Sequence, residues 1–385
     1  MRYWRGYLTA AIIAAITMGL MAIAERFSSL VDMVYPYVTR EFQSILAEWS
    51  STVPFTLWQV LAVGVVLAVA TTLVLMITLK WNFVEWLGWV LAGVSCIWLL
   101  HTGVYGLNYY AGPISTDIRL GSYEFTVEDL EEATIYFRDQ ANAMALEMER
   151  DENGALIYDD FDTLALQAGD GFHTLAYEQS GSVFAGSVLP VKQLGWADMY
   201  TSMGILGVTM PLTGEAAVNP QIPVVALPFT MCHEMAHRMC IATENDANFA
   251  AFLACLANES KQFQYSAYYM AYRYCYNALR SAGTAEAAAA AARVQLDVNT
   301  YLQYDLKMYD RFFQTHRDNN AANIADMAND GYIKASGDKN GTASYGQVSI
   351  YLVNWYIEKQ VLPFEEDDPG FDPLDKDFVH GALGE

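Results

Sequence analysis

Residues 230–237 read TMCHEMAH and contain the pattern His-Glu-x-x-His, which brings three potentially reactive side chains together. The surrounding residues favour a helix, in which positions four apart share one face. His233 and His237 can therefore bind one metal ion, with Glu234 beside them to act as a base. Only 6 histidines occur in 385 residues, so this spacing seldom arises by chance. The alternative is a solvated helix that carries two unrelated histidines.

A third metal ligand is expected a few residues later. Zinc in a hydrolytic site takes three protein ligands and keeps a fourth position for water. Glu244 is the expected ligand, because the threonine before it can cap a second helix and place it in the first turn. Asn248, one turn further, would then hold His233 or Glu244 in place. Asp246 is the rival ligand and would point away. Alternatively, Glu244 is only an acid favoured by the helix dipole.

These motifs resemble known families. Glu-x-x-Ala-Asn after His-Glu-x-x-His is similar to the gluzincin peptidases, whose third zinc ligand is a glutamate. Longer patches resemble an uncharacterised bacterial family of membrane-anchored proteins; they are residues 106–110, 204–216, 219, 228–230, 329–332 and 341–346. One position departs from the expected pattern: Cys240 stands where a glycine is expected for the sharp turn after the first helix.

The gluzincin resemblance also implies a substrate-binding strand. In such sites an edge strand that precedes the metal helix binds the substrate backbone by strand addition. By that analogy, a peptide would bind along residues 205–211 or 215–219. The candidate contacts are Val208, Thr209, Met210 and Glu215. The last of these would contact a substrate amine, or would be a solvated turn residue.

Three apolar stretches precede these motifs, at about residues 6–24, 55–79 and 86–106. Each can cross a hydrocarbon core of about 30 Å, which needs roughly 20 helical residues. We therefore predict three transmembrane helices. A mostly helical (mainly α, α+β) zincin-like domain with a small β element would follow at 107–362, and then an acidic tail at 363–385.

Basic residues indicate the orientation in a bacterial cell membrane. Arg2 and Arg5 precede the first span, and Lys80 lies in the turn between the second and third. The positive-inside rule then places the domain after residue 107 outside the cytoplasm, although as many bases lie near the spans on the other side. The first span can also be read as a signal peptide that ends at residues 22–24. In either case the chain that follows it begins outside.

Charge and cysteine content exclude some functions. Residues 107–385 carry the whole formal net charge of −23, which repels nucleic acid and anionic lipid. The charge would suit basic peptides, but solubility explains it equally well. The five cysteines form no disulfide framework. Membrane lipid and a peptide or protein substrate are the expected partners.

The function implied is that of a membrane-anchored zinc metallopeptidase. Zn²⁺ would lower the pKa of a bound water toward about 7, and Glu234 would take its proton. The donor that stabilises the oxyanion is not identified; Tyr345, Tyr332 and His316 are candidates, each also explained as a structural residue. The alternative is a non-catalytic sensory or binding module on a peptidase-like scaffold. Transport is disfavoured, because the spans contain no aspartate, glutamate, lysine or arginine and His101 is the only histidine within them.

Overall fold

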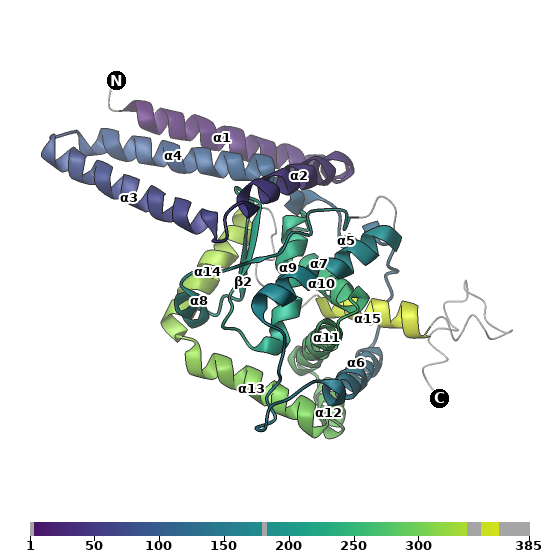
Figure 1. The fold of residues 1–385 in the computed structure, drawn as a ribbon. Helices are drawn as coiled ribbons and strands as arrows, with labels where there is room; N and C mark the ends of the chain where they lie inside the picture. The colour runs from purple at the N-terminus through teal and green to yellow at the C-terminus, as the bar shows by residue number, and fades with distance from the viewer. Residues whose placement is uncertain (1–3, 179–182, 337–347, 362–385) are drawn as a thin grey trace.

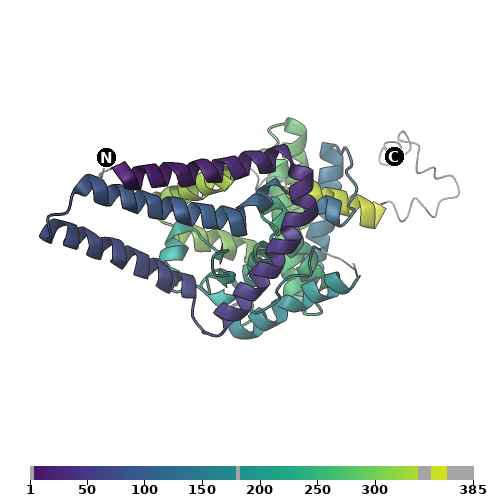
Figure 2. The ribbon, with the colours of Figure 1, turned by 90° about the horizontal axis from the view of Figure 1, so that it is seen from above.

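Three long apolar helices extend along one side of the molecule (Figures 1 and 2). They are α1 (Arg5–Arg26), α3 (Leu57–Thr78) and α4 (Phe83–Val104), and most of their side chains are exposed. Each is long and apolar enough to cross a membrane, which confirms the prediction of three such helices. The computed structural model describes residues 4–178, 183–336 and 348–361.

Helix α1 packs along α4 through a glycine on each helix. A Cβ atom added to Gly6 would lie 2.5 Å from the backbone carbonyl carbon of Gly88, so the two backbones meet too closely for a side chain. Small residues at such crossings allow apolar helices to associate in lipid. This pairing fixes the direction of α4, whose last turn carries His101.

A further helix, α2 (Ser28–Ser51), joins α1 to α3 and was not predicted. It runs crosswise to the spans (Figure 2). Its buried face includes Thr39, Arg40 and Gln43, which are in contact with the body of the molecule.

The body of the molecule is mainly helical, as predicted. Its longer helices are α6 (Val127–Glu147), α7 (Phe161–Glu178), α8 (Ala197–Met203), α9 (Leu227–Arg238), α10 (Glu244–Ala257), α11 (Lys261–Ser281), α12 (Ala285–Leu296), α13 (Thr300–His316), α14 (Asn319–Ser336) and α15 (Val348–Tyr356). Shorter helical elements are η2 (Gly106–Tyr110), α5 (Ile114–Asp117), η3 (Val224–Ala226) and the π-helical turn η5 (Ile357–Val361).

Helices α9 and α10 lie in the hydrophobic core, where α6, α7, α11 and α15 cover them. Helix α10 is rich in buried alanines, which permit close packing on α9. Its Phe252 packs edge-to-face on Phe137 of α6 and on Trp355 of α15. Burying one phenylalanine side chain stabilises a fold by roughly 1.5–3 kcal/mol, so these contacts hold α10 firmly in place.

The small β element is a three-stranded sheet of order β1-β3-β2. Its strands are β1 (Lys192–Gln193), β2 (Gly207–Met210) and β3 (Glu215–Val218). β1 pairs with β3 in parallel and β2 pairs with β3 antiparallel, so β2 is an edge strand. Helix α9 packs against both β2 and β3, which places the edge strand beside the His-Glu-x-x-His motif.

Several elements differ from the sequence-based expectation. Strand β1 and helices α7, α8 and α14 were not predicted. Only Arg317 and Asp318 separate α13 from α14, which begins at Asn319. Helix α15 is followed directly by η5. Residues 344–347 and the acidic tail at 363–385 lie outside the described residues.

Candidate metal centre

Helix α9 ends in a tight corner that turns the chain toward α10. The amide of Ile241 donates to the carbonyl of Ala236 (3.1 Å), and the amide of Cys240 donates to that of His237 (2.9 Å). This pair of bonds ends many helices and needs one residue in the left-handed conformation. Cys240 adopts it, with φ of 68°, at the position where a glycine was expected. The corner forms, at a backbone cost of about 1–2 kcal/mol.

Glu244 is the first residue of α10, and a cap on this helix fixes its place. Thr243 Oγ1 accepts from the Asp246 amide (3.3 Å) and donates to the Asp246 carboxylate (2.7 Å). The Asp246 side chain is therefore turned toward the cap, as expected for the rival ligand. The carboxylate of Glu244 is left to face α9.

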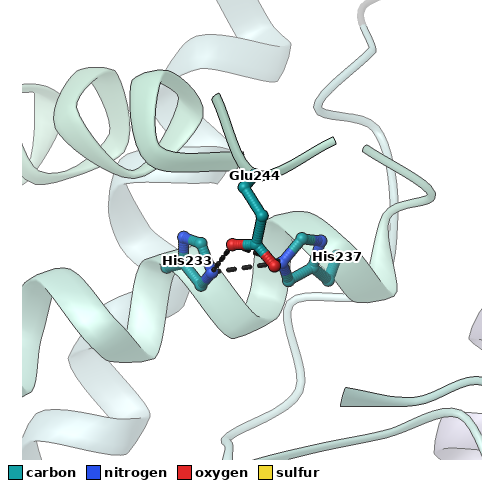
Figure 3. Close-up of side chains that lie close together, drawn as sticks. All are labelled: His233, His237 and Glu244. Atoms are coloured by element: carbon teal, nitrogen blue, oxygen red, sulfur yellow. Dashed lines mark hydrogen bonds and ion pairs between the residues drawn. The ribbon is translucent and has the colours of Figure 1, made fainter. Parts of the chain in front are cut away.

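The side chains of His233, His237 and Glu244 converge on one point (Figure 3). The two Nε2 atoms lie 3.1 Å apart, and Glu244 Oε2 lies 3.3 Å from that of His233 and 3.7 Å from that of His237. Around a tetrahedral zinc with bonds of 2.0–2.1 Å, neighbouring ligand atoms are about 3.3 Å apart. The spacing of these three atoms fits such an ion.

A backbone hydrogen bond fixes how one imidazole is presented. His237 Nδ1 lies 2.9 Å from the carbonyl oxygen of Ile241, which can only accept, so Nδ1 carries the proton. The other nitrogen, Nε2, then faces Glu244 and His233. Metal-binding histidines commonly have this kind of support. His233 Nδ1 is buried and has no hydrogen-bond partner in the described parts of the chain.

The cluster shifts the protonation of its own members. Burial lowers the pKa of His237, but the hydrogen bond to Glu244 and the charge of that carboxylate outweigh it and raise the pKa to about 9. Burial raises the pKa of Glu244, whereas hydrogen bonds from His233 and His237 bring it well below its ordinary value. The metal-free site thus holds an anionic carboxylate against a protonated imidazole, and a divalent cation can replace that proton.

Glu234 is buried between α9 and strand β2. Burial raises its pKa above the ordinary value, while His233, His237 and a hydrogen bond from Thr209 partly offset this rise. Thr209 Oγ1 lies 2.7 Å from the Glu234 carboxylate. A Cβ atom added to Gly207 would lie 2.5 Å from the other carboxylate oxygen, so only glycine leaves room there. A raised pKa suits a carboxylate that must both take and return a proton.

Strand β2 presents backbone groups along its outer edge. The Leu206 carbonyl accepts from the Asn219 amide directly opposite (2.8 Å), and bonded pairs alternate along an antiparallel ladder. The backbone groups of Gly207 and Thr209 therefore point away from β3. Among the described residues β2 pairs with β3 alone. Its outer edge is available for an added strand, next to Glu234.

A cavity of about 910 Å³ opens onto the cluster. Strand β2, α9 and the start of α10 form one wall, and α13 and α14 contribute to another. His101 at the end of span α4 and Tyr105 and Tyr109 just after it also line the cavity. Sequence reasoning did not connect these residues with the site, since more than a hundred positions separate them from the motif.

Of the predicted oxyanion donors, one lies in this cavity. Tyr332 lines it, and its hydroxyl lies 2.9 Å from His101 Nε2. His316 was a wrong choice: it lines a separate cavity of about 450 Å³, and its Nδ1 is bonded to the Phe312 carbonyl of its own helix. Tyr345 lies outside the described residues. Tyr274 of α11, which was not among the candidates, also lines the cavity.

The expected supporting role of Asn248 is not seen. Its side chain lines the cavity and is buried, but its carbonyl oxygen accepts from the hydroxyl of Tyr274 (3.1 Å). Its amide nitrogen has no partner within the described segments. Asn248 therefore makes no hydrogen bond to His233 or Glu244, because the α10 backbone directs it toward α11 instead.

Both interpretations of Glu215 were wrong. Its side chain is buried and paired with Lys192 at 2.7 Å. Its carboxylate also accepts from the amides of Leu57 and Trp58 (both 2.8 Å), the first residues of span α3. Glu215 thus joins the sheet to a membrane helix. Of the remaining strand candidates, Val208 packs in a small cluster with Tyr200, and Met210 lines the cavity.

The fold and the site define a mainly helical protein with three helices able to span a membrane and a His-His-Glu cluster beside a large cavity. The chain belongs to the family described as protein of unknown function (DUF3810), whose model matches residues 31–353. No curated protein and no solved structure matches the chain.

Proposed function

We propose that the protein is a zinc-dependent peptidase attached to the bacterial membrane, with its catalytic domain on the outer face. The observation that supports this most strongly is the spacing of the two Nε2 atoms and the Glu244 carboxylate, which matches the donor set and geometry of zinc hydrolases. His233, His237 and Glu244 would hold the ion, which supplies Lewis acidity when bound.

Glu234 is the general base in this proposal. Its carboxylate accepts a proton from the attacking water and passes it to the nitrogen of the departing amine. Burial raises the pKa of this carboxylate, which eases the uptake of the proton from water. Thr209 fixes the side chain so that the carboxylate stays beside the cluster.

The substrate in this proposal is an extended peptide that adds to the edge of β2. The outward backbone groups of Gly207 and Thr209 would pair with it, which brings a peptide bond next to Glu234. A cavity of about 910 Å³ has room for several residues of such a peptide. Tyr332 and Tyr274, which line the cavity, are candidates for the donor to the oxyanion.

Metal analysis and cleavage assays on the purified full chain test this proposal. We expect wild-type protein and Glu234→Gln to bind one zinc per chain, whereas Glu244→Gln loses most of it. Glu259→Gln, an exposed acid outside the cluster, is the matched control. Cleavage of a mixed peptide library should be abolished by a chelator and restored by zinc.

The base is tested separately from the metal. Glu234→Gln should lower the cleavage rate at least about 100-fold without loss of zinc. Undiminished cleavage by this variant would exclude Glu234 as the base. Zinc binding without cleavage by the wild-type protein would instead favour a sensory or binding module.

A further inference from the structure

Helix α2 has the reverse of the usual amphipathic pattern. Surface helices of soluble proteins turn their apolar side inward and their charged side to water. The outward face of α2 instead exposes large apolar side chains, each between 40% and 67% exposed. They are Leu30, Met33, Val34, Tyr37, Val38, Phe42, Ile45 and Trp49. Glu41 and Glu48 are exposed on the same face and interrupt it. So large an apolar surface, broken by only two charges, marks a contact with an apolar partner.

The inward face of α2 is polar and is bonded to the candidate metal centre. Arg40 Nε donates to the Met239 carbonyl at the end of α9 (3.1 Å). Gln43 Nε2 donates to the Pro211 carbonyl just after β2 (3.0 Å). These inward polar groups are thus bonded to the protein, and only the outward face of the helix remains open.

The position of α2 identifies its partner. The helix joins the end of span α1 to the start of span α3, so both of its ends lie at the same membrane boundary. It runs crosswise to the spans (Figure 2), which directs it along the membrane surface. Its outward face ends at Trp49, a residue type enriched at membrane interfaces.

We infer that α2 lies in the interfacial layer of the bilayer, where its large apolar side chains reach the acyl chains while the carboxylates of Glu41 and Glu48 stay among the headgroups. The only exposed charged residues on the helix are Glu41 and Glu48. Without an exposed base, the helix gains nothing from anionic headgroups, and zwitterionic lipid suffices. A symmetric pair of α2 helices would set these same acids against one another, which disfavours a second copy as the occupant.

This arrangement would hold the candidate centre at a fixed, short distance from the bilayer. The same helix that touches lipid bonds to the ends of α9 and β2, the two elements that carry Glu234 and its neighbours. The inference concerns the lipid contact alone, so it stands or falls independently of the proposed peptidase activity.

Spin labels on the full chain in phosphatidylcholine bilayers test this inference. Cys96→Ser removes the one exposed thiol, and single cysteines are then placed at Val38 and Ile45. Val65 in span α3 is the lipid-exposed control. Leu296, an exposed residue at the end of α12, is the aqueous control, because α12 lies far from the spans (Figure 1). Collision rates with oxygen, which partitions into lipid, are compared with those of a water-soluble nickel complex.

For labels at Val38 and Ile45, the ratio of the oxygen collision rate to the nickel collision rate should be several-fold higher than for a label at Leu296. It should approach the ratio for a label at Val65. A ratio equal to that at 296 would show that α2 lies in water, and would overturn the inference. Low collision rates with both reagents would mean that another protein surface, such as a second copy, covers the helix, and would also overturn it. Because all these side chains are exposed, the labels leave the packed core undisturbed.

Discussion

At the scale of single residues, the environment of Glu234 depends on one hydroxyl. The carboxylate is buried between α9 and β2, and Thr209 supplies a hydrogen bond at 2.7 Å that stabilises its charged form. Hydrogen bonds to charged groups contribute about 1.5–3 kcal/mol. The hydroxyl therefore contributes to the position of the carboxylate and to its affinity for a proton, alongside burial and the two histidines.

Thr209→Val should leave zinc content unchanged and lower the cleavage rate about 10-fold or more. Because the lost hydrogen bond had lowered the pKa of Glu234, that pKa rises further, and the acid limb of the kcat/KM profile moves to higher pH. Thr174→Val, which removes a hydroxyl bonded within α7, is the control. An unchanged acid limb would show that Thr209 does not act on Glu234.

The protonation state of His237 should make zinc binding depend on pH. Its pKa of about 9 in the metal-free protein means that the ring is protonated at pH 7, while zinc requires the neutral ring. Zinc affinity should therefore rise by up to about tenfold per pH unit between pH 6 and 9, with release of a proton. Titration calorimetry in buffers of different ionisation enthalpy measures that proton.

The same shift acts on stability. A raised folded-state pKa means that His237 stabilises the metal-free fold fully below about pH 6.5 and loses this contribution as the pH passes about 9.

His173→Gln, which removes an exposed histidine outside the cluster, should alter neither the dependence of zinc affinity on pH nor the proton release. Zinc affinity that stays flat from pH 6 to 9 would contradict a protonated His237.

At the scale of elements, the corner between α9 and α10 determines whether the three ligand atoms meet. Local signals predicted both helices: the spacing of the histidines placed one, and the cap at Thr243 placed the other. The left-handed turn was also predictable, because so short a connection requires one. The sequence alone could not show that Cys240 would accept this conformation, since its side chain packs on Thr39 and Asn108, far away in the chain.

Substitutions at Cys240 test how much strain the corner carries. Cys240→Gly relieves about 1–2 kcal/mol of backbone strain but loses buried contacts, so the free energy of unfolding should change by less than about 1 kcal/mol. Cys240→Val, which is β-branched, should destabilise the protein by more than about 2 kcal/mol and reduce its zinc content. Thermal unfolding followed by tryptophan fluorescence measures the stability of both variants, and metal analysis measures their zinc content. Cys96→Ser is the control for loss of a thiol. Equal unfolding temperatures for the two variants would contradict this account.

Helices whose sequence pattern depends on the elements packed around them were harder to predict than the membrane spans. The membrane spans stand out because a long apolar run needs no tertiary context. Helix α2 was missed because its polar residues face inward, the opposite of the pattern that indicates a packed helix. Helix α14 was missed because asparagines at its start resemble a loop.

At the scale of the whole molecule, the membrane helices and the body form one connected structure. The sequence suggested a boundary near residue 107, but bonds cross it at several points. Lys192 Nζ donates to the Ser50 carbonyl at the end of α2 (2.7 Å) and to the Phe55 carbonyl before α3 (3.0 Å). Such contacts join residues more than 130 positions apart, so no local pattern in the sequence could indicate them.

Glu215 is the central residue of this connection, because it joins the sheet to span α3. Its substitution distinguishes this structural role from the substrate contact first expected. Glu215→Gln leaves the partly buried ammonium of Lys192 without its counter-charge, which costs up to about 3–5 kcal/mol. We expect a clear fall in unfolding temperature, with zinc content and KM unchanged in the molecules that remain folded. Glu147→Gln breaks the exposed pair with Lys261 and should cost at most about 1 kcal/mol. If Glu215→Gln instead raised KM at unchanged stability, the carboxylate would have to face substrate, and the buried contact with Lys192 and α3 would be wrong.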